Sequence, residues 1–222
     1  MPRLWRNFAI SFRIWHRRRL FTFPSTTGGW VIQMDVVSHW FWGMAVTHGK
    51  IKGRFSGAMG VIPDLMAFLP VTIISLFTNH RNPRVDDTTR TEDFHPLSWE
   101  IYQWSHSAVT VIVCFLATWW YLEKYGTPKF LSRFYVATMS AKKQAFLIWL
   151  PWLLNIITDI PSHTAQFFPT PVFHPISDWR YDGTRWSEPS IWFTNLAILL
   201  TVWAAVIIIE RRKKASNEIS LV

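Results

Sequence analysis

The chain has 222 residues and a net charge of +9, and half of its residues are hydrophobic, including 15 tryptophans and 17 phenylalanines. Ordinary soluble domains carry far less aromatic side-chain area. The positive charge does not indicate a nucleic-acid-binding protein, because it gathers in clusters beside apolar runs and no recognition motif accompanies it. Composition therefore favours an integral membrane protein.

A basic arm comes first, over residues 1–33. It contains arginines but no acidic residue, and no signal-peptide cleavage site precedes the first apolar segment. Helical segments are then expected at about residues 34–49, 56–78, 101–123, 143–160 and 190–210.

Two apolar runs are long enough to cross a membrane outright. Residues 190–209 contain no charged side chain, and neither do residues 101–122. A helix of about 20 residues rises about 30 Å, which matches the hydrocarbon thickness. A large soluble helical core is the alternative, but tryptophans at the ends of the runs are typical of membrane interfaces. We expect an all-α, polytopic membrane helical bundle of four to five segments, some of them broken or re-entrant.

The charges of the connecting loops predict an orientation. The loop at 123–143 and the tail at 211–222 are basic, whereas the loops at 80–100 and 161–189 are mildly acidic. Because basic loops stay in the cytoplasm, we expect a multi-pass protein of the inner membrane with a cytoplasmic C-terminus. The first segment would then begin outside, in conflict with the basic arm. Three explanations of this conflict stay open. The arm lies outside the cytoplasm, against the positive-inside rule, or the first segment is re-entrant or interfacial. In the third, the chain begins near Met34 and the arm is a mis-assigned start.

Ionisable residues inside the apolar segments follow a pattern. Asp35 and His39 are four positions apart in DVVSHWFWG, and Asp159 and His163 repeat this spacing in TDIPSH. Residues four apart share one face of a helix, so each pair offers an oxygen and an imidazole nitrogen to one ion. Pro161 is expected to bend or end the helix within the second pair.

Two further residues complete a set of six potential metal ligands: Asp64, directly after Pro63 in GAMGVIPDL, and His106 in QWSHSAV. A lone membrane histidine is more often a packing residue, but the joint pattern is hard to satisfy in lipid except around a shared cation or in a proton path. Carboxylates and imidazoles without a thiolate suit Zn²⁺, Mn²⁺ or Fe²⁺. An open coordination position would activate water for hydrolysis, and Asp64, His106 and Asp159 are the candidates for catalytic roles.

Convergence of these ligands requires the second segment to be broken or unwound at Pro63, so that Asp64 reaches His106. Ser107 is expected to cap a helix or orient His106, because no relay is evident beside it.

The proline-rich loop at 161–189 contains Arg180, Arg185 and Trp186. Arginines beside a metal would suit an anionic phosphate or carboxylate substrate, and an interfacial aromatic belt is the other interpretation.

Four motifs, in this order and spacing, resemble a known family: DVVSHWFWG, GAMGVIPDL, WSHS and DIPSHTAQFFPTPVFHPISDWRYDGTRW. They resemble the membrane-bound metal-dependent hydrolase family, the YdjM-like inner-membrane hydrolases, over about residues 34–210. The resemblance implies a hydrolase-like domain there, between the arm at 1–33 and the tail at 211–222. It also implies a divalent metal, with Zn²⁺ favoured, and by analogy an ester or phosphoester substrate related to lipids.

The resemblance carries the site residues over to His39, Asp64, His106, Asp159 and His163. Relatives have His-Arg where this chain has Ile101 and Tyr102, so one metal is better supported than two. Two other functions stay open. A metal-ion or proton transporter could use the same residues, although no internal repeat is visible, and a non-catalytic membrane scaffold could retain the metal site. The expected partners are membrane lipids and a small-molecule or lipid substrate.

Overall fold

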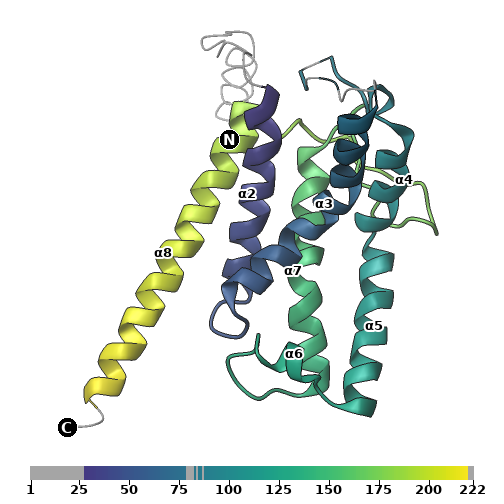
Figure 1. Cartoon of the computed structure of the whole chain (residues 1–222). Coiled ribbons are helices and arrows are strands. Elements are labelled where there is room, and N and C mark those ends of the chain that lie inside the picture. Colours follow the sequence, from purple (N-terminus) through teal and green to yellow (C-terminus); the bar gives the residue numbers. More distant parts are fainter. Residues whose placement is uncertain (1–27, 79–82, 84, 87, 220–222) are drawn as a thin grey trace, which may run out of the picture.

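The computed structural model describes residues 28–78, 83, 85–86 and 88–219; for 28–35, 214 and 218–219 it describes the backbone only. These residues form helices and loops and contain no β-strand, which confirms the predicted all-α class. The elements, shown in Figure 1, are α2 (Gly28–Val46), α3 (Gly53–Phe77), a 3-10 turn (Thr91–Asp93), α4 (Pro96–Ser105), α5 (Ala108–Tyr125), α6 (Lys129–Ser132), α7 (Ala141–Ser162) and α8 (Pro189–Ile219).

Helices α3, α7 and α8 are long and apolar enough to cross a membrane. Helices α4 and α5 pass the same test together, as a pair bent by 54° at a short break, which makes up to four spans. The expected membrane bundle is therefore present. The helical segment expected at about 101–123 is one of the broken segments, because the chain leaves the helix after Ser105 and re-enters it at Ala108.

The break between α4 and α5 is stabilised by side chains and by a distant loop. Ser107 is the N-cap of α5, where its Oγ accepts hydrogen bonds from the backbone of Val109 and Thr110. The Ala108 N–H donates to the carbonyl of Val172 at 2.9 Å. Backbone N–H and C=O groups that lose their helical hydrogen bonds inside a membrane bundle need other hydrogen-bond partners within the protein. The loop after α7 supplies them here.

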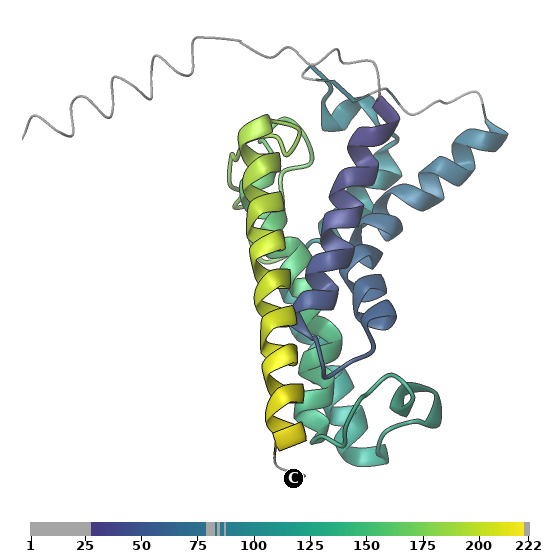
Figure 2. The same cartoon turned by 90° about the vertical axis from the view of Figure 1, so that its left-hand side faces the viewer.

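Helix α3 runs unbroken through Pro63, so the predicted unwinding at this proline was wrong. The helix bends instead, as Figure 2 shows. Pro63 and Pro70 account for the bend, since proline removes a backbone N–H and pushes away the carbonyl four residues before it. Asn155 of α7 donates its Nδ2 to the Gly60 carbonyl at 3.1 Å, next to the bend. Asp64 is thus placed on a bent but continuous helix.

Helices α2 and α3 touch through their backbones. A Cβ on Gly60 would lie 2.6 Å from the His39 carbonyl oxygen, and one on Gly43 would lie 2.6 Å from the Ser56 carbonyl oxygen. Only glycine permits such an approach. The His39 backbone is therefore held directly against α3.

The two ends of the bundle differ in charge. The end that carries α6 also carries the α2–α3 turn and the C-terminal part of α8 (Figure 1). Its described basic residues are Lys50, Lys52, Arg54, Lys124, Lys129, Arg133, Lys142, Lys143, Arg211, Arg212 and Lys213. The same end also carries Glu123 and Glu210. The opposite end carries the acidic residues Asp86, Glu92, Asp93, Asp178, Asp182 and Glu188 together with Arg90, Arg180 and Arg185, so acids are in excess there.

Candidate metal centre

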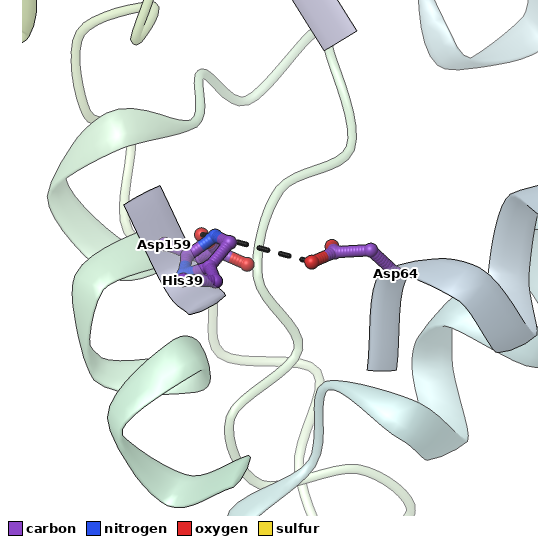
Figure 3. Close-up of side chains that lie close together, drawn as sticks. All are labelled: His39, Asp64 and Asp159. Atoms are coloured by element: carbon purple, nitrogen blue, oxygen red, sulfur yellow. Dashed lines mark ion pairs between the residues drawn. The ribbon is translucent and has the colours of Figure 1, made fainter. Parts of the chain in front are cut away.

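Three residues from three helices form a group that could hold a metal ion. His39 of α2, Asp64 of α3 and Asp159 of α7 are buried, and one ligand atom from each lies within 4.8 Å of the others. His39 Nε2 is 3.1 Å from Asp159 Oδ1 and 4.0 Å from Asp64 Oδ2. Metal–ligand bonds of about 2.0–2.2 Å place the ligand atoms of one ion about 3–4 Å apart. Figure 3 shows Asp64 facing the other two side chains.

A second imidazole contacts the other oxygens of the same carboxylates. His106 Nε2 lies 3.2 Å from Asp64 Oδ1 and 3.3 Å from Asp159 Oδ2. Each aspartate therefore presents one oxygen to His39 and the other to His106. The break between α4 and α5 makes this possible, because His106 is the residue that ends α4.

The Asp159 carboxylate needs a nearby positive charge. It is fully buried, and neither of its oxygens accepts a hydrogen bond with good geometry from the described residues. Two carboxylates in an apolar bundle require positive charge, which either protonated imidazoles or a metal ion would provide. The donor set of carboxylate oxygen and imidazole nitrogen is one that divalent metals accept. The residues present therefore fit a metal ion.

Hydroxyl groups orient both imidazoles. Thr158 Oγ1 donates to the backbone carbonyl of Leu154 or Asn155, so its oxygen is left to accept from His39 Nδ1 at 3.3 Å. Ser105 Oγ lies 3.0 Å from His106 Nδ1. A histidine whose Nδ1 donates to an outer partner offers its Nε2 to a metal. The structure therefore places a serine and a threonine where a metal site needs supporting partners.

His163 lies beside this group but outside the three-residue set. It caps the C-terminal end of α7, and its Nδ1 is 2.7 Å from the Tyr102 hydroxyl and 2.8 Å from the Phe168 carbonyl oxygen. It follows Asp159 by one helical turn, and its backbone N–H donates to the Asp159 carbonyl at 3.1 Å. Phe168 has a φ of 45°, a strained conformation for a bulky residue, and this turn brings its carbonyl to the imidazole.

Asn155 and Tyr102 are functional candidates that the sequence interpretation missed. Asn155 donates its Nδ2 to Asp64 Oδ2 at 2.8 Å, and it lies one helical turn before Asp159. An amide in the apolar run LLNIITD was the available signal. Tyr102 is fully buried and stacks on His106 with ring centroids 3.7 Å apart.

The remaining predicted residues lie around the centre. Arg180 stacks on Trp99, with its guanidinium carbon 4.9 Å from the ring centroid, and Trp99 stacks on Tyr102. Arg185 donates to the backbone carbonyls of Asp86 and Thr89.

The Trp186 backbone N–H donates to the Ser162 carbonyl at 2.8 Å, which ties the loop to the end of α7. Among the described interactions, none joins the side chain of Arg180, Arg185 or Trp186 to the carboxylates of the candidate metal centre. Asp35 lies in α2, but its side chain is outside the described part of the chain.

Comparisons of the chain with family models, with curated protein sequences and with solved structures find no match. The functional assignment therefore rests on the side chains of the metal centre and on the motifs of the sequence.

Proposed function

We propose that this protein is a membrane-bound metal-dependent hydrolase whose metal is held by His39, Asp64 and Asp159. The observation that carries the proposal is the buried pair of carboxylates, each shared between two oriented imidazoles. Three protein ligands leave a coordination position open, as catalytic rather than structural sites do. A bound metal would act as a Lewis acid and activate water for attack on an ester or phosphoester. Zn²⁺ is the favoured ion, and Mn²⁺ and Fe²⁺ suit the same donors.

The residues differ in the roles that they fit. Asp159 is fully buried and is the anchoring ligand, whereas Asp64 is 7% exposed and is the better general base. Asn155 orients the Asp64 carboxylate through its 2.8 Å hydrogen bond. His106 contacts both carboxylates and can hold or return a proton there.

The surface beside Asp64 supports a substrate related to lipids. Leu65, Met66 and Leu69 follow it on α3, and all three are exposed. In a membrane such side chains face hydrocarbon, so the most exposed ligand lies next to the lipid phase. A phosphoester or carboxylic ester on a lipid could then approach from that side.

Metal analysis and activity assays test the proposal. Full-length protein purified without chelator is expected to contain about one transition metal ion per chain and to hydrolyse ester or phosphoester substrates. Chelation is expected to remove the activity, and the matching metal to restore it. Wild-type protein without stoichiometric metal would overturn the assignment.

A metal-ion or proton transporter is the second candidate. It is favoured by the burial of the whole group between helices that are apolar enough to span a membrane. Flux into proteoliposomes that disappears in His106→Ala, without any hydrolysis by the wild type, would favour transport. A scaffold that retains the site would instead lose thermal stability in His39→Ala and show neither activity.

We further propose that the α6 end faces the cytoplasm, with the C-terminus, in the inner membrane. Its basic residues support this orientation through the positive-inside rule. A tag fused after Val222 is expected to resist protease added to intact spheroplasts and to be cleaved after lysis. Cleavage in intact spheroplasts would reverse the orientation.

A further inference from the structure

Two loops at the α6 end are joined by backbone hydrogen bonds. The Lys52 N–H donates to the Phe134 carbonyl at 2.8 Å, and the Val136 N–H donates to the Lys50 carbonyl at 3.0 Å. The α2–α3 turn and the segment after α6 are far apart in sequence. Their backbones are nevertheless held next to one another.

Buried groups strengthen this junction. Ile51 forms an antiparallel bridge with Tyr135, and Ile51 is almost fully buried. Phe55 stacks on Phe134 with centroids 4.5 Å apart. Burial raises the pKa of the Tyr135 hydroxyl well above its usual range, so it stays neutral and adds no negative charge here.

Four exposed cations lie on the junction or on the adjoining α6: Lys50, Lys52, Lys129 and Arg133, which we term the basic platform. No carboxylate among the described residues forms an ion pair with any of the four. A rigid backbone that holds like charges together without a counter-charge favours an anionic ligand.

Apolar side chains lie among these cations. Phe130 on α6 is 64% exposed and Val136 is 60% exposed. At the edge of the same end, Lys124 lies over the Trp120 ring at 5.1 Å, and Lys142 lies over the Trp119 ring at 4.9 Å. Lysine and tryptophan together are typical of the membrane–water interface. The ligand must therefore offer negative charge next to hydrocarbon, which free phosphate and nucleic acids do not.

We infer that the basic platform is a binding site for anionic phospholipids of the adjacent leaflet. The four cations contact headgroup phosphates, and Phe130 and Val136 insert beside them. This inference is independent of the proposed hydrolase function, because the platform lies at the α6 end and shares no residue with the metal centre.

Native mass spectrometry of the full-length protein in detergent tests the site. Phosphatidylglycerol and phosphatidylcholine are titrated separately against the wild type. A Lys129→Ala/Arg133→Ala variant is compared with Arg212→Ala/Lys213→Ala, which removes the same charge from exposed positions of α8. We expect selective phosphatidylglycerol binding that weakens about tenfold or more in the platform variant, since two basic residues that attract the anionic headgroup are removed.

Three outcomes would overturn the inference: equal binding of the two lipids by the wild type, equal losses in the two double variants, or competition by inorganic phosphate as strong as by phosphatidylglycerol. Phe130→Ser adds a second measurement and is expected to weaken binding of the lipid but not of glycerol phosphate. Circular dichroism and metal content, expected to be unchanged in all variants, show that folding and the metal centre are intact.

Discussion

Helices α7 and α8 are both apolar enough to cross a membrane, yet they are used in opposite ways. Half of the most apolar part of α7 is buried inside the protein, compared with 6% for α8. Helix α8 is the more apolar of the two and packs against α2, whereas α7 contacts α2, α3 and α5. The greater hydropathy therefore belongs to the exposed helix α8, and the polar residues within α7 identify the helix that builds the candidate site.

Two polar side chains of α8, Asn195 and Glu210, attach it to α2 and to the turn that follows α2. Asn195 accepts a hydrogen bond from Trp42 Nε1 at 2.8 Å and donates to Ser38 Oγ at 2.6 Å. Farther along, Glu210 lies 3.6 Å from His48. Polar side chains often join membrane helices in this way, with modest energies. In α7, by contrast, Asn155 and Asp159 point at the metal centre.

The largest effect is expected from Asp159→Asn on α7. This change removes a charged ligand from a fully buried position, so metal affinity should fall by more than the 10–100-fold that is typical of losing a supporting partner. Isothermal titration with Zn²⁺ or metal analysis after dialysis measures it. Asp178→Asn, at an exposed carboxylate, is the control. Retention of wild-type affinity by Asp159→Asn would remove α7 from the metal centre.

Gly60→Ala is expected to have the next largest effect, a loss of stability. Its Cβ would meet the His39 backbone oxygen at 2.6 Å, so α2 must move away from α3 at a cost of about 1–3 kcal/mol in unfolding free energy. Gly53→Ala is the matched control, because its Cβ would meet only the flexible end of the Met44 side chain. Thermal denaturation in detergent compares the two. Equal stability of both variants would contradict the tight contact.

Thr158→Val tests the orientation of His39. The change keeps the side-chain shape but removes the oxygen that faces Nδ1, so metal affinity should fall about tenfold, at the lower end of the range for such partners. Thr201→Val on α8 is the control, because Thr201 also donates to a carbonyl four residues earlier but faces no imidazole. A similar loss in both variants would indicate a general effect on the helices.

Asn195→Leu should have the smallest effect. It removes the hydrogen bonds to Trp42 and Ser38, and membrane side-chain hydrogen bonds of this kind contribute about 0.6 kcal/mol on average. The melting temperature should fall slightly while metal content stays unchanged. Loss of metal in this variant would show that α8 supports the centre and that the contrast with α7 is wrong.

The apolar runs were sufficient to predict the class and most helices, because lipid requires long uninterrupted apolar segments. Ser107, which was expected to cap a helix, was a local signal of the break at His106 and is indeed the N-cap of α5. The carbonyls that complete the break were not predictable, since they come from residues near Val172. Pro63 indicated that α3 departs from a straight helix, but not whether the helix bends or unwinds there. A bend keeps more backbone hydrogen bonds than an unwound segment, and an unwound segment would have needed further partners.

In the candidate site, too, some residues could be predicted from the sequence and others could not. His39, Asp64 and Asp159 stood out because ionisable residues are rare in apolar segments. Thr158 and Ser105 did not, because helical hydroxyls commonly bond to their own backbone. The second partner of Thr158 lies on α2, and that of Ser105 is the imidazole of the next residue, His106. The turn at Phe168 carried no sequence signal, since neither glycine nor asparagine occupies its left-handed position.

The contact between the α4–α5 break and the loop after α7 has a consequence for biogenesis. The Ala108 N–H and the Ser107 hydroxyl bond to the carbonyls of Val172 and His174, which are synthesised more than sixty residues later. Until that loop is synthesised, the Ala108 N–H and the Ser107 hydroxyl lack these partners, and the break between α4 and α5 is incomplete. The hydrogen bonds that complete the break beside His106 can therefore form only after the ribosome has passed α7, which places this step late in membrane insertion.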